Sequence, residues 1–181
     1  MAEARDPGGP TAPGPPADAA PADPPSVPLE RLRSQFPEEI REAGSGAGQV
    51  TALVGSARLR ELLLFLRDDD ACRLDLLLDL CGADYPEREQ RFEVIYHLYS
   101  IPVGHFLRVK TRARDGEAVP SATAVWATAD WFEREVFDLF GVPFRDHPDL
   151  RRILMPEGWR GHPLRKEYPL AGFPDQHLRL R

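Results

Sequence analysis

The side chains best suited to chemistry gather in the C-terminal third of the chain. Three are carboxylates, at Glu133, Glu135 and Asp138, and two are histidines, at His147 and His162. In a pocket such groups hold a metal ion or transfer protons, so a metal-dependent hydrolase is one interpretation. Their spacing does not require it, because the sequence has no HExxH pair, nucleophile elbow or glycine-rich phosphate loop. We therefore expect no catalytic residues.

Arginine offers the same carboxylates a structural role. Arg134, Arg151 and Arg152 are close in the sequence, and the planar guanidinium binds carboxylates bidentately. Whether such pairs form within the chain or across an interface stays open at this point. Each of the two histidines precedes a proline, which is more typical of a hydrogen bond in a turn than of metal ligation.

The two cysteines, Cys72 and Cys81, form no CxxC motif and no array with histidine. They are too few to ligate an iron–sulfur cluster or to complete a zinc site. We expect both to be buried free thiols in a reducing cytoplasm. The chain is accordingly predicted to bind no metal and no cofactor.

Composition narrows the class of protein. The 181 residues are 42% hydrophobic, which is enough for the core of one domain, and their formal net charge is −6. An acidic chain argues against nucleic acid as a partner, because phosphate-binding surfaces are basic. We expect no signal sequence and no membrane-spanning run, and the acidic N-terminal region differs from a mitochondrial presequence. These features are typical of a bacterial cytosolic protein.

Hydrophobic periodicity predicts an α+β fold, a two-layer domain in which helices pack on a mainly antiparallel sheet. A leader rich in proline and alanine, residues 1–28, is expected to be disordered. The domain itself is expected to span residues 29–141. Its predicted elements are helices over 29–40 (interrupted at Pro37), 57–67 (capped by Ser56) and 130–140, strands over 49–54, 92–100, 105–113 and 122–126, and a strand or helical turn over 74–80.

The last predicted helix carries the carboxylates. Asp130, three residues before Glu133, resembles the start of a capping box, and Gly141 is expected to end the helix. Trp131 is expected in the core, and the carboxylates of Glu135 and Asp138 are expected on the outer side. The inward-facing stripe is predicted to be Phe132, Val136, Leu139 and Phe140.

Residues 142–181 form an irregular arm. Prolines recur too often there for a long helix. Large apolar residues are nevertheless spread through the arm, unlike in a disordered tail. Such a segment becomes ordered only by lying on a surface, and we expect that surface to belong to another subunit.

Several strings of residues also carry a family resemblance. They are RFEVIYHL at 91–98, EREVFD at 133–138, HPDLRRIL at 147–154 and GHPLRKEYP at 161–169. With them the chain resembles the C subunit of the proton-translocating NADH-quinone oxidoreductase, respiratory complex I. The resemblance implies a cofactor-free structural subunit of the peripheral arm of that complex. It would brace the D subunit, which helps to form the quinone site, with the B and I subunits nearby.

The same resemblance implies a location and an interface. The chain would lie at the cytoplasmic side of the bacterial inner membrane, attached through the complex alone. FMN, iron–sulfur clusters, NADH and quinone would bind to other subunits. A related membrane-bound hydrogenase or another quinone-linked dehydrogenase is the alternative. The expected partner-binding residues are Arg151, Arg152, Trp159, His162, Arg165, Lys166 and Tyr168.

Overall fold

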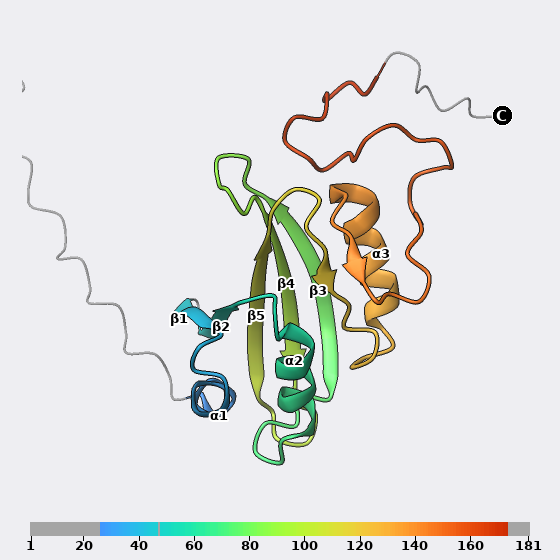
Figure 1. Ribbon diagram of the computed structural model, residues 1–181. Coiled ribbons are helices and arrows are strands. Elements are labelled where there is room, and N and C mark those ends of the chain that lie inside the picture. Colours follow the sequence, from blue (N-terminus) through green and yellow to red (C-terminus); the bar gives the residue numbers. More distant parts are fainter. Residues whose placement is uncertain (1–25, 47, 174–181) are drawn as a thin grey trace, which may run out of the picture.

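The computed structural model describes residues 26–46 and 48–173, which fold around one sheet (Figure 1). Its strands are β1 (Ile40–Gly46), β2 (Gln49–Val54), β3 (Leu76–Asp84), β4 (Phe92–Tyr99) and β5 (Phe106–Ala113). They lie in the order β1-β2-β5-β4-β3. The pair β2 and β5 is parallel and the other neighbours are antiparallel. The predicted α+β class with a mainly antiparallel sheet is confirmed.

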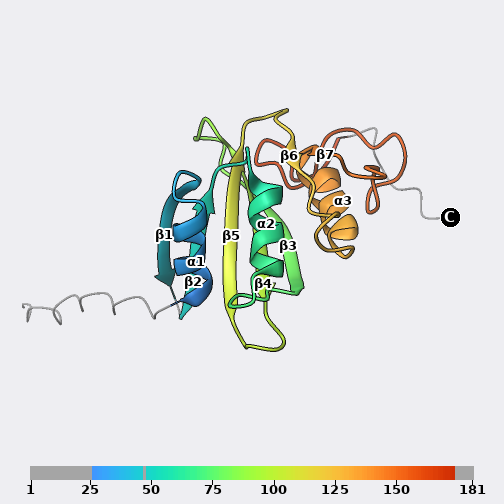
Figure 2. The same cartoon turned by 60° about the horizontal axis from the view of Figure 1, so that its bottom comes forward.

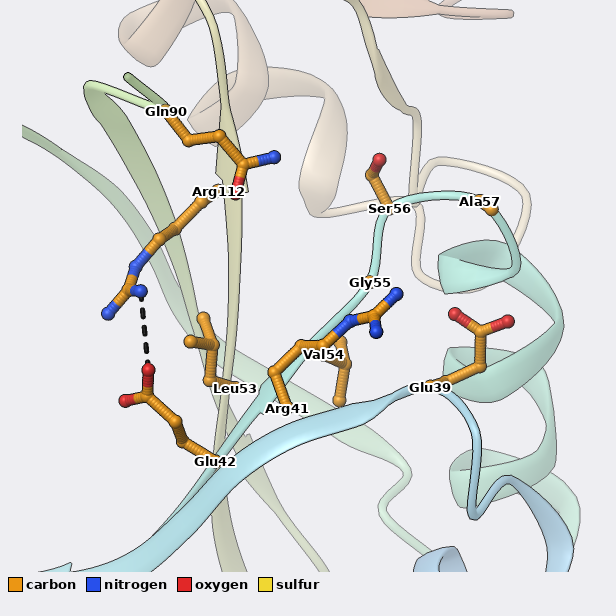
Figure 3. A pocket seen from close by; sticks show the side chains of 10 residues that line it. All are labelled: Glu39, Arg41, Glu42, Leu53, Val54, Gly55, Ser56, Ala57, Gln90 and Arg112. Carbon is orange, nitrogen blue, oxygen red and sulfur yellow. Dashed lines mark hydrogen bonds and ion pairs between the residues drawn. The ribbon is translucent and has the colours of Figure 1, made fainter. Parts of the chain in front are cut away.

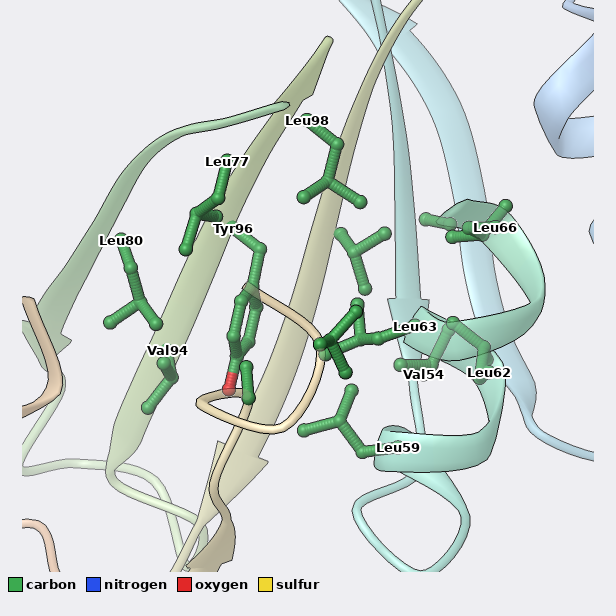
Figure 4. Close-up of a cluster of buried hydrophobic side chains, with 14 of the residues drawn as sticks. Val54, Leu59, Leu62, Leu63, Leu66, Leu77, Leu80, Val94, Tyr96 and Leu98 are labelled. Atoms are coloured by element: carbon green, nitrogen blue, oxygen red, sulfur yellow. The ribbon is translucent and has the colours of Figure 1, made fainter. Parts of the chain in front are cut away.

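Helices form the second layer. They are α1 (Val27–Gln35), α2 (Leu59–Asp68) and α3 (Ala129–Phe140). Figure 2 shows α1 and α2 in front of the sheet, and α3 beside β3 at one end of it. Because leucine recurs at helical spacing in α2, one side of that helix buries against the sheet. Figure 4 shows these leucines facing Tyr96 and Leu98 of β4. They are Leu59, Leu62, Leu63 and Leu66.

The predictions for the centre of the sheet hold. Residues 92–100 and 105–113 form the expected hairpin, β4 and β5. The segment that was ambiguous between strand and helical turn is the edge strand β3, paired along its length with β4. Side chains in β4 alternate as a half-buried strand requires. The buried apolar ones are Phe92, Val94, Tyr96 and Leu98, and the carboxylate of Glu93 is buried as well.

Other local predictions were wrong. The first helix ends at Gln35, before Pro37, and the polar, glycine-containing residues after it form β1. Residues 122–126 make a helical turn instead of a strand, since the N–H groups of Val125 and Trp126 both donate to the carbonyl of Ala122. The N-cap of α2 is Arg58, so Ser56 does not cap it. The end of the first helix before Pro37 agrees with the predicted interruption there, since a proline disfavours helix in the residue before it.

The predicted leader, residues 1–28, lies outside the described residues except for its last three. Ser26 caps α1, and its hydroxyl accepts a hydrogen bond from the N–H of Leu29 at 3.4 Å. Pro28 sits in the first turn of that helix, where its missing N–H removes no hydrogen bond. The first helix therefore starts at Val27, inside the predicted leader.

The arm lies on its own chain. Its first residues form β7 (Phe144–Arg145), which pairs in parallel with β6 (Val119–Pro120). Val142 and Phe144 are buried in the same core as the sheet and helices. The rest of the arm, to residue 173, runs past α3 (Figure 1). The described part of the arm is therefore ordered on the chain itself, and its docking on another subunit stays a prediction.

Candidate functional site

The candidate site is the surface formed by α3 and the arm, and Asp138 is at its centre. The Asp138 carboxylate is fully buried and accepts hydrogen bonds from the N–H groups of three consecutive arm residues, at 3.1, 2.8 and 2.8 Å. Arg152 donates to its second oxygen at 3.1 Å. Hydrogen bonds to an ionised group are stronger than neutral ones. Asp138 therefore fastens the arm to the helix. The three residues are Ile153, Leu154 and Met155.

The carbonyl groups at the end of α3 form a second junction with the arm. Nδ1 of His162 lies 2.8 Å from the carbonyl oxygen of Asp138, and Nε of Arg165 donates to the carbonyl of Phe140 at 2.6 Å. The last carbonyls of a helix have no partner within it, so side chains from outside must satisfy them. Arg165 also pairs with Asp115 at 2.9 Å, which connects the arm to the loop after β5.

A third junction reaches the edge strand β3. Arg91 bridges Asp84 and Glu167, with a distance of 2.7 Å to each carboxylate. The N–H of Lys166 also donates to Asp84, at 2.8 Å. Burial by itself would raise the pKa of Asp84, but Arg91 and the Lys166 N–H hold that pKa below its ordinary value. The arm is thus fixed at three separated points.

Glu133 is the other buried carboxylate of α3, and it faces the interior. It accepts hydrogen bonds from the hydroxyl of Ser121 at 2.7 Å and from the N–H of Ala122 at 2.6 Å. Burial raises its pKa to about 7, against the effect of these two donors. The N-cap of α3 is Thr128, without a side-chain hydrogen bond, so the predicted capping box was wrong. Glu133 instead holds the turn that follows β6.

His147 connects this interior group to the arm. Its side chain is fully buried, and its Nε2 lies 3.3 Å from the carboxylate of Asp130 and 4.0 Å from that of Glu133. Its Nδ1 accepts a hydrogen bond from the N–H of Asp149 at 3.0 Å, which confirms the predicted role in a turn. The prediction that Glu135 and Asp138 face outward is confirmed for Glu135, which is exposed. It was wrong for Asp138, which is fully buried, as is Glu133.

The residues expected to bind a partner have different roles in the structure. Arg152, His162 and Arg165 bond to α3, and Lys166 contributes its backbone. Arg151 is 71% exposed and pairs with Asp149, its neighbour in the arm. These contacts identify what orders the arm, and binding to another subunit stays a prediction.

The aromatic residues of the arm also contact the chain itself. The rings of Tyr168 and Phe173 meet edge to face, with centroids 5.3 Å apart. The ring N–H of Trp159 is buried and has no hydrogen-bond partner among the described residues. The arm therefore has a small apolar cluster of its own near its end.

Trp131 is the main residue that the sequence predictions placed wrongly. It is 61% exposed on the outer side of α3, where Arg134 lies 5.1 Å from its ring. Its place was readable in the sequence, because it precedes the exposed Glu135 by one helical turn and lies off the apolar stripe. Large exposed apolar side chains mark interaction surfaces. Those of α3 and the arm are Trp131, Leu154, Leu164 and Leu170.

A pocket between β1, β2 and the start of α2 is the other candidate (Figure 3). Its volume is about 310 Å³, and its walls carry both acids and bases. Arg112 pairs with Glu42 across it at 3.4 Å, while Arg41 and Glu39 approach each other at its other end (Figure 3). Charges of both signs leave it without a clear preference for an anion or a cation.

Within residues 26–46 and 48–173, no helix is long and apolar enough to cross a membrane.

Comparison with known proteins gives a consistent result. A family model described as "Respiratory-chain NADH dehydrogenase, 30 Kd subunit" matches residues 52–174. The chain is 47% identical over 141 residues to the C subunit of NADH-quinone oxidoreductase from Hyphomonas neptunium, covering 78% of this chain and 70% of that one. It is 51% identical over 126 residues to the same subunit of Caulobacter vibrioides, covering 70% and 64%. These matches span less than three quarters of the relatives' own lengths.

A solved structure shares the fold. It is the membrane-bound sulfane sulfur reductase, an archaeal respiratory membrane complex, and one of its chains matches with a TM-score of 0.63. The match covers 79% of this chain and 84% of that chain, at 23% identity. At this identity the likeness concerns the fold alone.

Proposed function

The chain belongs to the family of the 30 kDa subunit of respiratory-chain NADH dehydrogenase, and from this premise we propose that it is the C subunit of an NADH-quinone oxidoreductase. Its role there is structural: it braces the D subunit, next to the B and I subunits, at the cytoplasmic side of the inner membrane. The chain is then a subunit of an enzyme and supplies no catalytic residues of its own. Identities of 47% and 51% favour this complex over the related hydrogenases and dehydrogenases.

One observation carries the proposal for a bracing role. The arm is fastened to α3 and β3 at three points, yet it leaves Leu154 and Leu164 exposed, together with Trp131 on the helix. Electron transfer requires fixed distances between carriers, so a subunit that positions its neighbours must itself be rigid. A rigid surface that presents a tryptophan and leucines suits docking, because few groups must become ordered on binding.

We expect the electron carriers to bind elsewhere in the complex. An iron–sulfur cluster takes four ligands, commonly cysteines, whereas this chain has Cys72, which is buried, and Cys81, which is half-buried. Backbone N–H groups already occupy the carboxylates of Glu133 and Asp138, which argues against a metal-dependent hydrolase. FMN, iron–sulfur clusters, NADH and quinone are assigned to the other subunits.

The test is co-purification from membranes with a tagged chain. Trp131→Glu and Leu164→Glu change exposed side chains, so the fold should survive, while a carboxylate in the interface should weaken recovery of the D subunit at least tenfold. The matched control is Ile101→Glu, which alters a residue 66% exposed at the turn between β4 and β5. If both α3–arm variants recover the D subunit as well as the control does, this surface is not the docking surface. If the unaltered chain recovers none of the B, D and I subunits, the assignment itself fails.

A further inference from the structure

Three side chains of different chemistry meet on the sheet. They are Asp79 and Cys81 of β3 and His97 of β4, and one potential ligand atom from each lies within 4.8 Å of the other two. Asp79 is paired directly with His97, and Cys81 follows two residues along the same strand. Residues two apart share a face of a strand, so the ladder itself brings the three together. The pairing has an irregularity between Leu77 and Asp79, a feature that re-aims side chains.

We propose that Asp79, Cys81 and His97 bind a zinc ion. Thiolate, imidazole and carboxylate are the three ligand types that Zn²⁺ uses in proteins. Three protein ligands leave a fourth position for water or for a group from a partner. This inference goes beyond the proposed function and does not depend on it.

The geometry is close to what the ion needs. Bond lengths of about 2.3 Å to sulfur and about 2.0–2.2 Å to nitrogen and oxygen place tetrahedral ligands roughly 3.3–3.6 Å apart. From the limit of 4.8 Å, the three ligand atoms need to close by roughly 1–1.5 Å at most. Side-chain rotations would have to supply this movement. Among the described residues, none forms a hydrogen bond or an ion pair with the three side chains, so binding breaks no such contact.

The ligand atoms must carry no proton when they bind the ion. Burial lowers the pKa of His97, so its imidazole is neutral and ready to bind at pH 7. Burial, followed by the charge of Asp79, raises the pKa of Cys81. The thiol must lose its proton to the solvent when the zinc–sulfur bond forms.

Two cations near the site have to be considered. Arg108 is paired with His97 across the ladder, and Lys110 acts on both Cys81 and His97. Each already has a partner: Arg108 donates to Gln49, and Lys110 pairs with Glu93 at 2.8 Å.

The charge of the ion is balanced within the site. One thiolate and one carboxylate together neutralise Zn²⁺, and Glu135 of α3 adds negative potential at the thiol. Because zinc has no redox chemistry, the site joins β3 to β4 and carries no electrons.

This inference departs from the sequence-based expectation of no metal. That expectation counted cysteines and their spacing to histidine along the chain. Cys81 and His97 are 16 positions apart, so no short motif marks them. The register between β3 and β4 makes them neighbours, and register depends on the whole sheet.

The experiment titrates the full chain, freed of metal by a chelator, with Zn²⁺ in competition with a chromophoric chelator, and separately with Co²⁺. We expect one ion per chain and a thiolate-to-cobalt absorption band. Asp79→Asn, Cys81→Ser and His97→Gln should each weaken zinc binding at least tenfold, and Cys81→Ser should abolish the band.

Two control variants test whether the other cysteine or another histidine binds the ion. Cys72→Ala and His105→Gln should bind zinc as the unaltered chain does, and circular dichroism should show that all variants are folded. Failure of the unaltered chain to bind one zinc ion at micromolar concentration would overturn the proposal. So would a cobalt band that depends on Cys72, or binding that ignores all three ligand substitutions.

Discussion

The imidazole of His162 lies only 2.6 Å from the position that a β-carbon at Gly141 would take, which is closer than such an atom tolerates. Gly141 ends α3 with a φ of 74°, a left-handed conformation that glycine adopts without strain. Helix termination and attachment of the arm thus depend on the same residue.

Gly141→Ala should therefore destabilise the chain in two ways. The left-handed backbone costs about 1–2 kcal/mol for a residue with a β-carbon, and the methyl group would also displace His162 and Arg165. Gly104→Ala is the matched control, because Gly104 has a φ of 73° but open space around it. Denaturant unfolding should show the larger loss at Gly141. Equal losses of unfolding free energy would mean that His162 and Arg165 move aside without destabilising the chain.

The buried carboxylate of Asp138 should matter far more than its exposed neighbour on α3. Asp138→Ala leaves three backbone donors and Arg152 without their acceptor, and removing one member of a buried charged network costs about 3–5 kcal/mol. Glu135→Ala removes an exposed carboxylate and should change stability by about 0.5 kcal/mol or less. Limited proteolysis should cut the Asp138 variant within residues 150–156. Protection there equal to that of the Glu135 variant would contradict the fastening role.

Glu133 predicts a loss of stability with rising pH. Burial raises its pKa in the folded chain from an ordinary 4.5 to about 7, so the folded state holds this proton more tightly than the unfolded state does. The associated stability is complete below pH 4.5 and is lost as the pH rises through 7. The total is about 3 kcal/mol.

Glu133→Gln isolates this effect, because the amide cannot ionise. Between pH 5 and pH 8 the variant should lose less stability than the unaltered chain, measured by denaturant unfolding at each pH. Asp84, whose pKa is lowered, contributes in the opposite sense and at lower pH, and it is present in both proteins. Parallel pH profiles would show that Glu133 is already ionised when folded.

Arg151 and Arg152 are neighbours with separable effects. Arg152→Ala removes a bond to buried Asp138 and should lower the unfolding free energy by about 1.5–3 kcal/mol. Arg151→Ala changes a side chain that is 71% exposed and should leave stability within about 0.5 kcal/mol. If Arg151 contacts the D subunit, its variant should lose co-purification while remaining stable. Loss of both properties in both variants would mean that the two roles are not separate.

The predictions that succeeded rest on features repeated within one element. Leucines at helical spacing identified α2, and alternation identified the buried face of β4. Predictions failed where the sequence allowed a single residue to lie either in the core or on the surface. Trp131 was assigned to the core by size alone, and Asp138 to the surface by charge alone. Their actual environments are reversed, because what matters is which neighbour covers each side of α3.

Sequence alone determined the family, the α+β class and the irregular character of the arm, because these follow from ordered strings of residues and from local periodicity. Tertiary structure decided where the arm lies, which carboxylates are buried and that Cys81 stands beside His97. Periodicity identifies the faces of a helix or strand, but it does not say what packs against them. Strand register and the path of an arm without periodicity depend on contacts between residues far apart in the chain, and these exist only once the whole core has formed.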